Sequence, residues 1–468
     1  MNRLPWTRTV PVALLAASVL TPTIARSVRA QQVTAFTNVN IIPMDRERVL
    51  ENQTVIVREG RVVALGPAGS VEIPDAARRI DGRGKYLMPG LAEMHAHIPP
   101  PAMRQLGLGR QWVEDVLYLY VANGVTTIRG MLGDPSHLAL REQAEAGGVV
   151  APRIWTSGPS VNGTSVQTPD SAQRTPRFQQ AAGYDFIKIH PGLTRETFDS
   201  LDAAADRLGF VFAGHVPAAV GIERAIEARY ASIDHLDRYV EWLAGQPTAP
   251  AAVSGFFGAG LIEAVDDAKI AEIARRTREA GVWNVPTQTL MDSWASPLTP
   301  DQMAAAHPEI RYIPAGMRQQ WMNWKRQAGE AATPAQRDRY IAVRHALLRA
   351  LRDAGAGLLL GSDAPQVWNV PGFSAHGELA AVVAAGLTPY EALSTGTTNV
   401  ARFFAVEERA GSIAVGRQAD FILLDGNPLD EITNTRRQRG VMIRGVWMPR
   451  DEIARQLDAI AARYAQAG

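Results

Sequence analysis

The 468-residue sequence contains no cysteine. This absence excludes disulfide bonds, thiolate metal sites and cysteine nucleophiles, so packing alone must hold the core together. Any metal ion would have to be bound by imidazole nitrogen, carboxylate oxygen or a more unusual ligand.

Charge of one sign is also scarce, because 48 basic and 47 acidic residues leave a formal net charge of +1. Proteins that bind nucleic acids or anionic membranes usually carry a concentrated basic surface. We therefore expect a small-molecule substrate and no nucleic-acid partner, and the sequence leaves a homo-oligomer open. A serine nucleophile elbow, a Walker loop and a dinucleotide fingerprint are also missing from suitable contexts, which excludes those enzyme classes.

Long apolar runs are absent except for one at the N-terminus. Arg3 and Arg8 flank its start, the apolar segment covers 10–20, and small residues follow near Ala30. This order is typical of a signal peptide, and the run has about half of the roughly 20 residues that a membrane-spanning helix needs. We expect residues 1–30 to be removed during export to the periplasm or the medium, with no membrane contact afterwards. A membrane anchor is the alternative.

Strand-like patterns occupy both ends of the remaining chain. Residues 31–88 alternate apolar and polar side chains between Gly and Pro turns. Strand-like segments return at 419–424 and 441–444, and the pattern of 450–465 predicts a closing helix. We expect 31–88 and 405–468 to build one small β-sandwich from both chain ends, with two separate β units as the alternative.

Residues 89–404 alternate short apolar segments with helical patterns. Several of these helical patterns end in Gly, which fits a left-handed C-cap. Alternating strands and helices predict parallel strands, and eight such units predict a closed (β/α)8 barrel. The expected strands are 91–95, 125–129, 153–158, 184–189, 210–214, 231–235, 282–286 and 357–362.

Six polar side chains fall at or near the C-terminal ends of these strands. All strand ends of such a barrel converge on one face, so residues that are distant in sequence would meet there. His95 and His97 are two residues apart and would point to the same side, where two imidazoles can bind one cation. The six candidates are His95, His97, Lys188, His215, His235 and Asp363.

The segments that carry these residues resemble those of the amidohydrolase superfamily. The segment from Met88 to His97 resembles the first-strand motif, and 411–420 resembles a segment typical of the β-sandwich. The likeness runs from about residue 33 to 448, and the branch that looks most similar holds imidazolonepropionase-like proteins, barrel-type Xaa-Pro dipeptidases and ochratoxin-hydrolysing amidases. The other matching segments are Phe186–Ile189, Ala213–His215, Ser232–His235 and Leu360–Ala364.

The resemblance implies a role for each candidate. A first divalent ion would be held by His95, His97 and Asp363, and a second by His215 and His235. Lys188 would bridge the two ions as N6-carboxylysine, because a lysine ammonium has no lone pair and cannot ligate a metal. An ordinary salt-bridging Lys188 is the alternative. We expect zinc, since imidazole and carboxylate suit it, with Mn²⁺ and Co²⁺ as alternatives.

The implied reaction is hydrolysis of an amide-like C–N bond in a peptide, an N-acyl amino acid or a cyclic amide. Two ions that share one water lower its pKa enough to give hydroxide near neutral pH. Asp363 would accept the proton and pass it to the leaving nitrogen. Two alternatives remain: a mononuclear deaminase or cyclic-amidine hydrolase with unmodified Lys188, and a non-catalytic binding protein.

Several other residues have open roles. His190 either hydrogen-bonds substrate or packs behind the site, and Arg129 binds either a substrate carboxylate or an internal one. We expect His376 to make structural hydrogen bonds. The aromatic-rich segment 239–333 either forms a lid over the substrate or packs on itself. The histidines expected at the surface are His137, His307 and His345.

Overall fold

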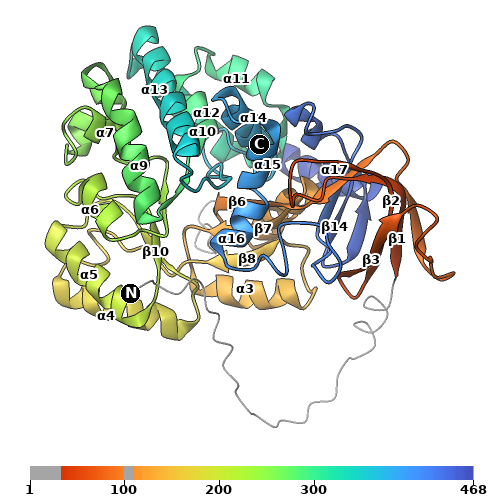
Figure 1. Ribbon diagram of the computed structural model, residues 1–468. Coiled ribbons are helices and arrows are strands. Elements are labelled where there is room, and N and C mark those ends of the chain that lie inside the picture. Colours follow the sequence, from red (N-terminus) through yellow and green to blue (C-terminus); the bar gives the residue numbers. More distant parts are fainter. Residues whose placement is uncertain (1–32, 100–108, 467–468) are drawn as a thin grey trace.

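The computed structural model describes residues 33–99 and 109–466 (Figure 1). The expected signal peptide therefore lies outside the described residues. Within the described residues, no helix combines the length and the apolar character needed to cross a membrane.

One eight-stranded sheet takes its strands from both ends of the chain, and Figure 1 shows the red N-terminal strands beside the blue β14. Strand β13 pairs antiparallel with β5, which confirms the predicted pairing between the two end regions. Phe36 packs edge-on against Phe421 and Trp447, so side chains from both ends share a core. The strands are β1 Thr34–Ile41, β2 Leu50–Arg58, β3 Arg61–Pro67, β4 Arg78–Asp81, β5 Tyr86–Pro89, β13 Phe421–Leu424, β14 Gln438–Ile443 and β15 Val446–Pro449.

The middle of the chain forms two parallel sheets, one of three strands and one of four. Seven of the eight predicted strands are present at their expected places, which confirms an α/β fold with parallel strands. The three-stranded sheet contains β6 Leu91–Ala96, β7 Val125–Gly130 and β8 Arg153–Thr156. The four-stranded sheet contains β9 Ile187–Ile189, β10 Phe212–Gly214, β11 Ser232–Asp234 and β12 Trp283–Val285.

The eighth predicted strand, 357–362, is an irregular extended segment. Leu358 forms a parallel bridge with Asn284 of β12, and Ala364 forms one with Ala96 of β6. Asp363 adopts a left-handed φ of 69°, which a regular strand cannot accommodate. Further bridges link the other edges of the two parallel sheets, between β8 and β9.

The helices between these strands follow from amphipathic patterns and explicit end signals. In α9 the buried residues Ile270, Ile273, Ala274 and Thr277 recur at helical spacing. Gly281 ends this helix in the left-handed conformation, as predicted. The other helices next to the parallel strands are α2 Arg110–Ala122, α3 Pro135–Glu145, α4 Pro169–Ala182, α5 Arg195–Leu208, α6 Gly221–Glu227, α13 Pro334–Asp353, α14 Phe373–Ala384, α15 Pro389–Thr395 and α16 Thr398–Phe403. Helix α17, Arg450–Gln466, closes the chain.

The aromatic-rich segment 239–333 forms short helices around β12. Phe256 stacks on Trp294 at 5.2 Å and contacts Trp324 edge-on at 5.8 Å. These contacts confirm mutual packing for part of the segment. The helices are α7 Tyr239–Leu243, α8 Ala251–Ser254, η2 Phe256–Ala264, η3 Asp267–Lys269, α10 Gln288–Ala295, α11 Pro300–Ala306, η4 Pro308–Tyr312 and α12 Ala315–Glu330.

A buried carboxylate joins β6, the irregular eighth segment and α14. Glu93 is fully buried and accepts hydrogen bonds from the backbone N–H and the hydroxyl of Ser362. The Ser362 hydroxyl also lies 2.7 Å from that of Ser374 on α14. Burial raises the pKa of Glu93 from 4.5 to about 8, so the folded protein keeps this carboxyl protonated over most of the neutral range.

Replacing Glu93 with Gln should make the protein less sensitive to alkaline pH. Because its pKa is raised in the folded state, Glu93 favours folding at low pH, and that stability is lost as pH rises from about 4.5 to 8. Between pH 5 and 8 the free energy of unfolding of the wild type should fall by roughly 3 kcal/mol more than that of Glu93→Gln. Denaturant titrations at both pH values measure this, with the exposed Glu51→Gln as control, and parallel pH profiles would contradict it.

Candidate metal centre

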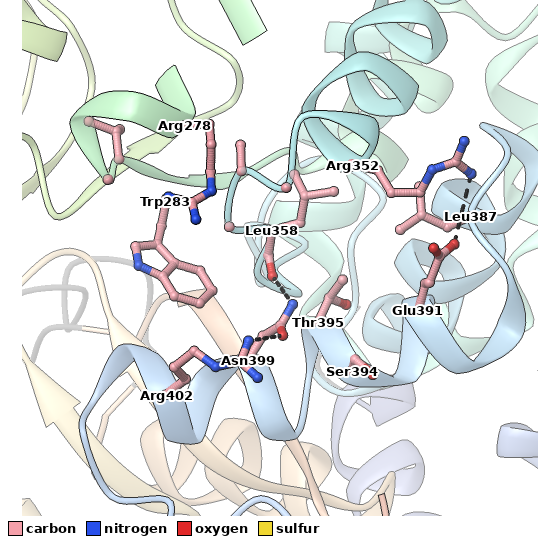
Figure 2. A pocket seen from close by; sticks show the side chains of 15 residues that line it. Arg278, Trp283, Arg352, Leu358, Leu387, Glu391, Ser394, Thr395, Asn399 and Arg402 are labelled. Carbon is pink, nitrogen blue, oxygen red and sulfur yellow. Dashed lines mark hydrogen bonds and ion pairs between the residues drawn. The ribbon is translucent and has the colours of Figure 1, made fainter. Parts of the chain in front are cut away.

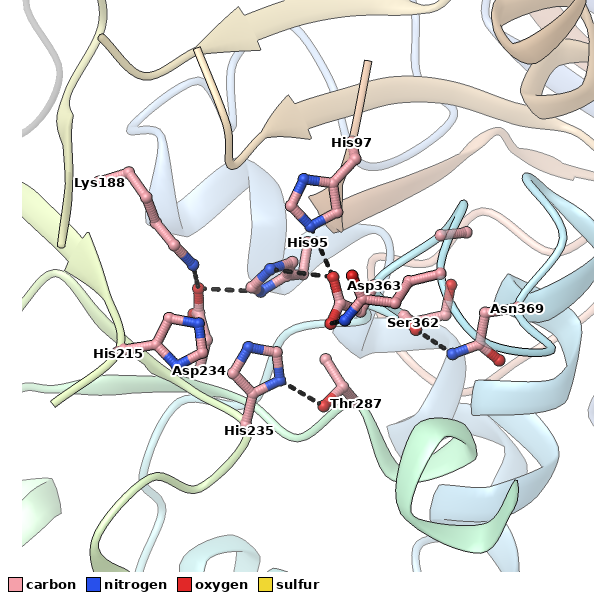
Figure 3. Close-up of polar contacts among 12 residues, drawn as sticks. His95, His97, Lys188, His215, Asp234, His235, Thr287, Ser362, Asp363 and Asn369 are labelled. Carbon is pink, nitrogen blue, oxygen red and sulfur yellow. Dashed lines mark hydrogen bonds and ion pairs between the residues drawn. The ribbon is translucent and has the colours of Figure 1, made fainter. Parts of the chain in front are cut away.

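The structure brings the six predicted side chains together at the C-terminal ends of the parallel strands (Figure 3). His95 lies at the end of β6, Lys188 lies in β9, and the others directly follow β6, β10, β11 or the eighth segment. Parallel strands end at one edge of a sheet, and this places side chains from distant parts of the sequence around one centre.

Three of the six residues already have the spacing of a cation site. Nε2 of His97 lies 2.6 Å from Oδ1 of Asp363, and Nε2 of His95 lies 3.3 Å from the same oxygen. Ligand atoms of these three residues all lie within 4.8 Å of one another. The centroid of the His235 ring lies 4.5 Å from that of His95, and the centroid of the His215 ring lies 4.6 Å from that of His235.

The hydrogen bonds of His235 determine which of its nitrogens can bind a metal. The Thr287 hydroxyl donates to the carbonyl of Pro286 at 2.7 Å, so its oxygen accepts from Nδ1–H of His235 at 2.8 Å. The lone pair of the ring is therefore on Nε2. This Nε2 is buried and has no hydrogen-bond partner among the described residues, which is the state that a metal ligand requires.

The His215 imidazole is oriented in the same way by a carboxylate. Its Nδ1 lies 2.8 Å from Oδ2 of Asp237, and because a carboxylate only accepts hydrogen bonds, the ring presents the lone pair of Nε2 to the centre. Nδ1 of His95 lies 3.0 Å from Oδ2 of Asp234, but among the described residues neither atom has a hydrogen-bond partner. Burial lowers the pKa of His95 well below its usual value, which keeps that ring neutral.

Lys188 has no ordinary partner for its amine. Its side chain is fully buried, and Nζ makes no hydrogen bond to the described residues. Its nearest carboxylate oxygen is Oδ2 of Asp234 at 3.5 Å. Burial lowers the pKa of Lys188, which favours the neutral amine.

Arg129 belongs to the interior of the protein and is not free for substrate. Its guanidinium donates to the carbonyl of Met94 at 2.7 Å, to Ser232 at 2.9 Å and to Asp234 at 3.2 Å. Of the two roles that the sequence left open, the structure therefore confirms pairing with an internal carboxylate.

The remaining five histidines differ in burial and in their contacts. His190 borders the centre, and its Nδ1 lies 2.7 Å from the Ser160 hydroxyl. His376 bonds Thr435 and the carbonyl of Asn123, as expected of a structural residue. The surface location predicted for His137 is wrong, because its ring is 1% exposed and accepts from a backbone N–H at the start of α3. The other two, His307 and His345, are half-buried.

A cavity of about 230 Å³ opens onto this centre. Its polar lining consists of His95, His97, His190, His215, Asp363 and Gln366. The rest of its wall is apolar, as in many ligand sites, and consists of Ile98, Pro99, Trp112, Leu132, Phe257, Met317 and Pro365.

A larger cavity of about 530 Å³ lies at the opposite, N-terminal ends of β12 and the eighth segment (Figure 2). Its polar groups bind one another: Asn399 donates to the carbonyl of Leu358 at 3.0 Å, and Arg352 lies 3.8 Å from Glu391. This end of parallel strands usually serves stability, so we assign the reactive centre to the smaller cavity.

Arg344 of α13 holds the backbone around His235. Its fully buried guanidinium donates to the carbonyls of His235 and Pro286, both at 2.8 Å, and to Gln288 at 3.0 Å. His235 and Thr287 both have left-handed φ values, 63° and 49°, which non-glycine residues rarely adopt. These hydrogen bonds therefore fix the two strained residues whose side chains meet at Nδ1 of His235.

Comparison with known proteins agrees with this arrangement. The sequence profile of the amidohydrolase family matches residues 86–448, which is more than half of the chain. The chain belongs to the amidohydrolase family. This membership accounts for the strand-end motifs that the sequence analysis identified.

Individual relatives of this amidohydrolase are distant. It is 37% identical to the imidazolonepropionase of Stenotrophomonas maltophilia over 14% of this chain and 16% of that protein. It is 25% identical to the adenine deaminase of Deinococcus deserti over 82% of this chain and 54% of that protein. The chain thus spans less than two thirds of the length of both curated relatives.

A solved structure of a bottromycin amidohydrolase shares the fold. Its TM-score to this chain is 0.69 at 24% identity, with 95% of this chain and 94% of that one covered. At this level of identity the similarity establishes the fold alone.

Replacing Arg344 with Met should weaken binding of a divalent cation at His235. Loss of a residue that orients a metal ligand typically lowers metal affinity about tenfold to a hundredfold. Zinc titration against a competing chelator measures the affinity, and thermal unfolding shows whether the variant is folded. Arg349→Met is the matched control, because Arg349 lies on the same helix but donates to Ala385. Equal zinc affinity in folded Arg344→Met and wild type would contradict the prediction.

Proposed function

We propose that this chain is an exported, binuclear metal-dependent hydrolase that cleaves an amide-like C–N bond of a small molecule. Its scaffold in this proposal is a closed (β/α)8 barrel, with a small β-sandwich built from both chain ends. Family membership, the parallel strands and the bridges at their edges support this architecture.

The observation that carries the proposal is that two nitrogen atoms of the candidate metal ligands are buried without hydrogen-bond partners. Nε2 of His235 and Nζ of Lys188 are buried without a hydrogen bond to the described residues. Leaving such groups unsatisfied in the interior costs about 1–3 kcal/mol each, and a bound cation with a modified lysine would remove that cost. The donor set, four imidazoles and one carboxylate without thiolate, fits zinc.

In this proposal each residue has a defined place at the metals. His95, His97 and Asp363 would hold the first ion, and His215 and His235 would hold the second. Lys188, as N6-carboxylysine, would be a ligand shared by the two ions. The deep burial of Lys188 and the lack of a hydrogen bond at its Nζ among the described residues support the modification, because a charged ammonium would be disfavoured beside two cations.

The bound ions would lower the pKa of a water molecule and polarise the carbonyl of the substrate. Asp363 accepts the proton of that water and delivers it to the leaving nitrogen. Gln366 donates to Oδ2 of Asp363 at 3.0 Å and thereby fixes the carboxylate plane. His190, held by Ser160, hydrogen-bonds the substrate or leaving group, and the apolar walls exclude bulk water.

A mononuclear deaminase or cyclic-amidine hydrolase is the second candidate. It is favoured because only His95, His97 and Asp363 form a compact group of ligand atoms among the described residues. The similarity to a protein named adenine deaminase agrees with it. In this case Lys188 stays unmodified and binds Asp234.

The metal content of the purified protein distinguishes the two candidates. We expect two zinc ions per chain in the wild type and at most one in Lys188→Ala, which should also lose activity on amide substrates. Short carboxylic acids should partly restore the second ion and the activity, because they can replace the lost carbamate. Lys269→Ala, at a partly exposed lysine, is the control.

One ion per chain together with release of ammonia from a heterocycle would support the mononuclear candidate. A fully active protein without metal would contradict both.

Export is tested by the N-terminus of the mature protein. We expect the chain produced with residues 1–30 to appear outside the cytoplasm with a new N-terminus close to Gln31, because the apolar run resembles a cleaved signal. N-terminal sequencing of the purified protein measures this. A chain that keeps Arg3 and stays with the membrane fraction would indicate the anchor instead.

A further inference from the structure

We infer that Phe257 is a specificity-determining residue that selects substrates with a planar apolar group next to the scissile C–N bond. This inference rests on the proposed metal centre and adds the chemical class of group that the cavity accepts. The argument comes from the position of the ring, the conformation of its backbone and the side chains behind it.

The Phe257 ring lies directly beside two of the proposed metal ligands and lines the cavity. Its centroid is 4.9 Å from that of His235, and it stacks on His215 at 6.2 Å with an angle of 15° between the planes. A group bound at the ions must therefore pass or contact this ring.

The backbone is strained in a way that points Phe257 at the centre. Phe257 has φ 46° and ψ 47°, a left-handed conformation that a bulky side chain rarely adopts. Gly255 and Gly258 on either side also have positive φ values, and a Cβ at position 258 would lie 2.5 Å from that of Val240. Strained residues of this kind concentrate at ligand sites, where the surrounding structure holds them in place.

The side chains behind Phe257 hold it in this conformation. Phe256 meets its ring edge-on at 4.8 Å and is itself stacked on Trp294. The Tyr340 hydroxyl donates to the carbonyl of Phe257 at 3.3 Å. Since Phe256 fills the packed side of the turn, Phe257 is left as its cavity-facing aromatic.

The rest of the cavity wall is largely apolar. Trp112, Leu132 and Met317 supply further apolar wall, and the polar groups are concentrated at the metal end. Aromatic rings favour offset-stacked or edge-to-face contacts, which add to simple burial of apolar area. A planar aromatic group attached to the reacting carbonyl thus fits the cavity, with the carbonyl at the ions and the ring against Phe257.

Two hydroxamic acids test the inference without a known substrate. Acetohydroxamic and benzohydroxamic acid carry the same metal-binding group, and only the second adds an aromatic ring. Calorimetric titration of the zinc-loaded protein gives the Kd of each. We expect the wild type to prefer benzohydroxamic acid and Phe257→Leu to reduce this preference about tenfold. The Kd of acetohydroxamic acid should stay within about twofold.

Phe257→Gly gives a second test, because glycine adopts the left-handed conformation readily and the turn should survive. Phe373→Leu is the matched control: Phe373 stacks on Tyr312 outside the cavity, so the preference should stay at the wild-type value. An unchanged preference in both Phe257 variants, with both acids still bound, would overturn the inference and leave the metal centre standing. If neither acid binds the zinc-loaded wild type, the metal centre and the inference both fail.

Discussion

The geometry of the centre depends on one buried carboxylate. Asp234 contacts His95 of β6, Arg129 of β7 and Lys188 of β9, so a single side chain connects three strands. Burial opposes its ionisation, but the charge of the Arg129 guanidinium outweighs burial and holds the pKa of Asp234 below its usual value. An ionised Asp234 lies 3.0 Å from Nδ1 of His95 and offsets the charge of Arg129, which would otherwise be isolated in the interior.

A second set of contacts holds the backbone near the centre in place. Arg344 reaches from α13 to the carbonyls of His235 and Pro286, while Glu378 of α14 accepts from the backbone N–H groups of Gln288 and Thr289, both at 2.8 Å. Helices distant in sequence thus fix the left-handed residues His235 and Thr287 beside the centre. The strain of those residues is local, and the hydrogen bonds that hold them are spread over several elements.

The sequence predicted the features that follow from local pattern and from a general rule of topology. Strand periodicity located seven strands, and the convergence of parallel strand ends brought His95, Lys188 and His235 together. The residues that orient the ligands were missed, because a role such as that of Arg344 depends on which carbonyls it meets after folding. Asp234 and Asp237 stood beside His235 in the sequence, and their closeness to a ligand was the available signal. The surface location expected for His137 failed because a helix-capping side chain can be polar and still buried.

The pairing of β5 with β13 also has a consequence for how the chain is made. All the parallel strands, β6 to β12, lie between these two strands in the sequence, so the terminal sheet cannot be completed until Phe421–Leu424 has been synthesised. Until then the edge of β5 that later receives β13 exposes unpaired backbone groups, which can join to another chain. A chain that ends before Phe421 would therefore keep this edge of β5 unpaired and open to contact with another chain.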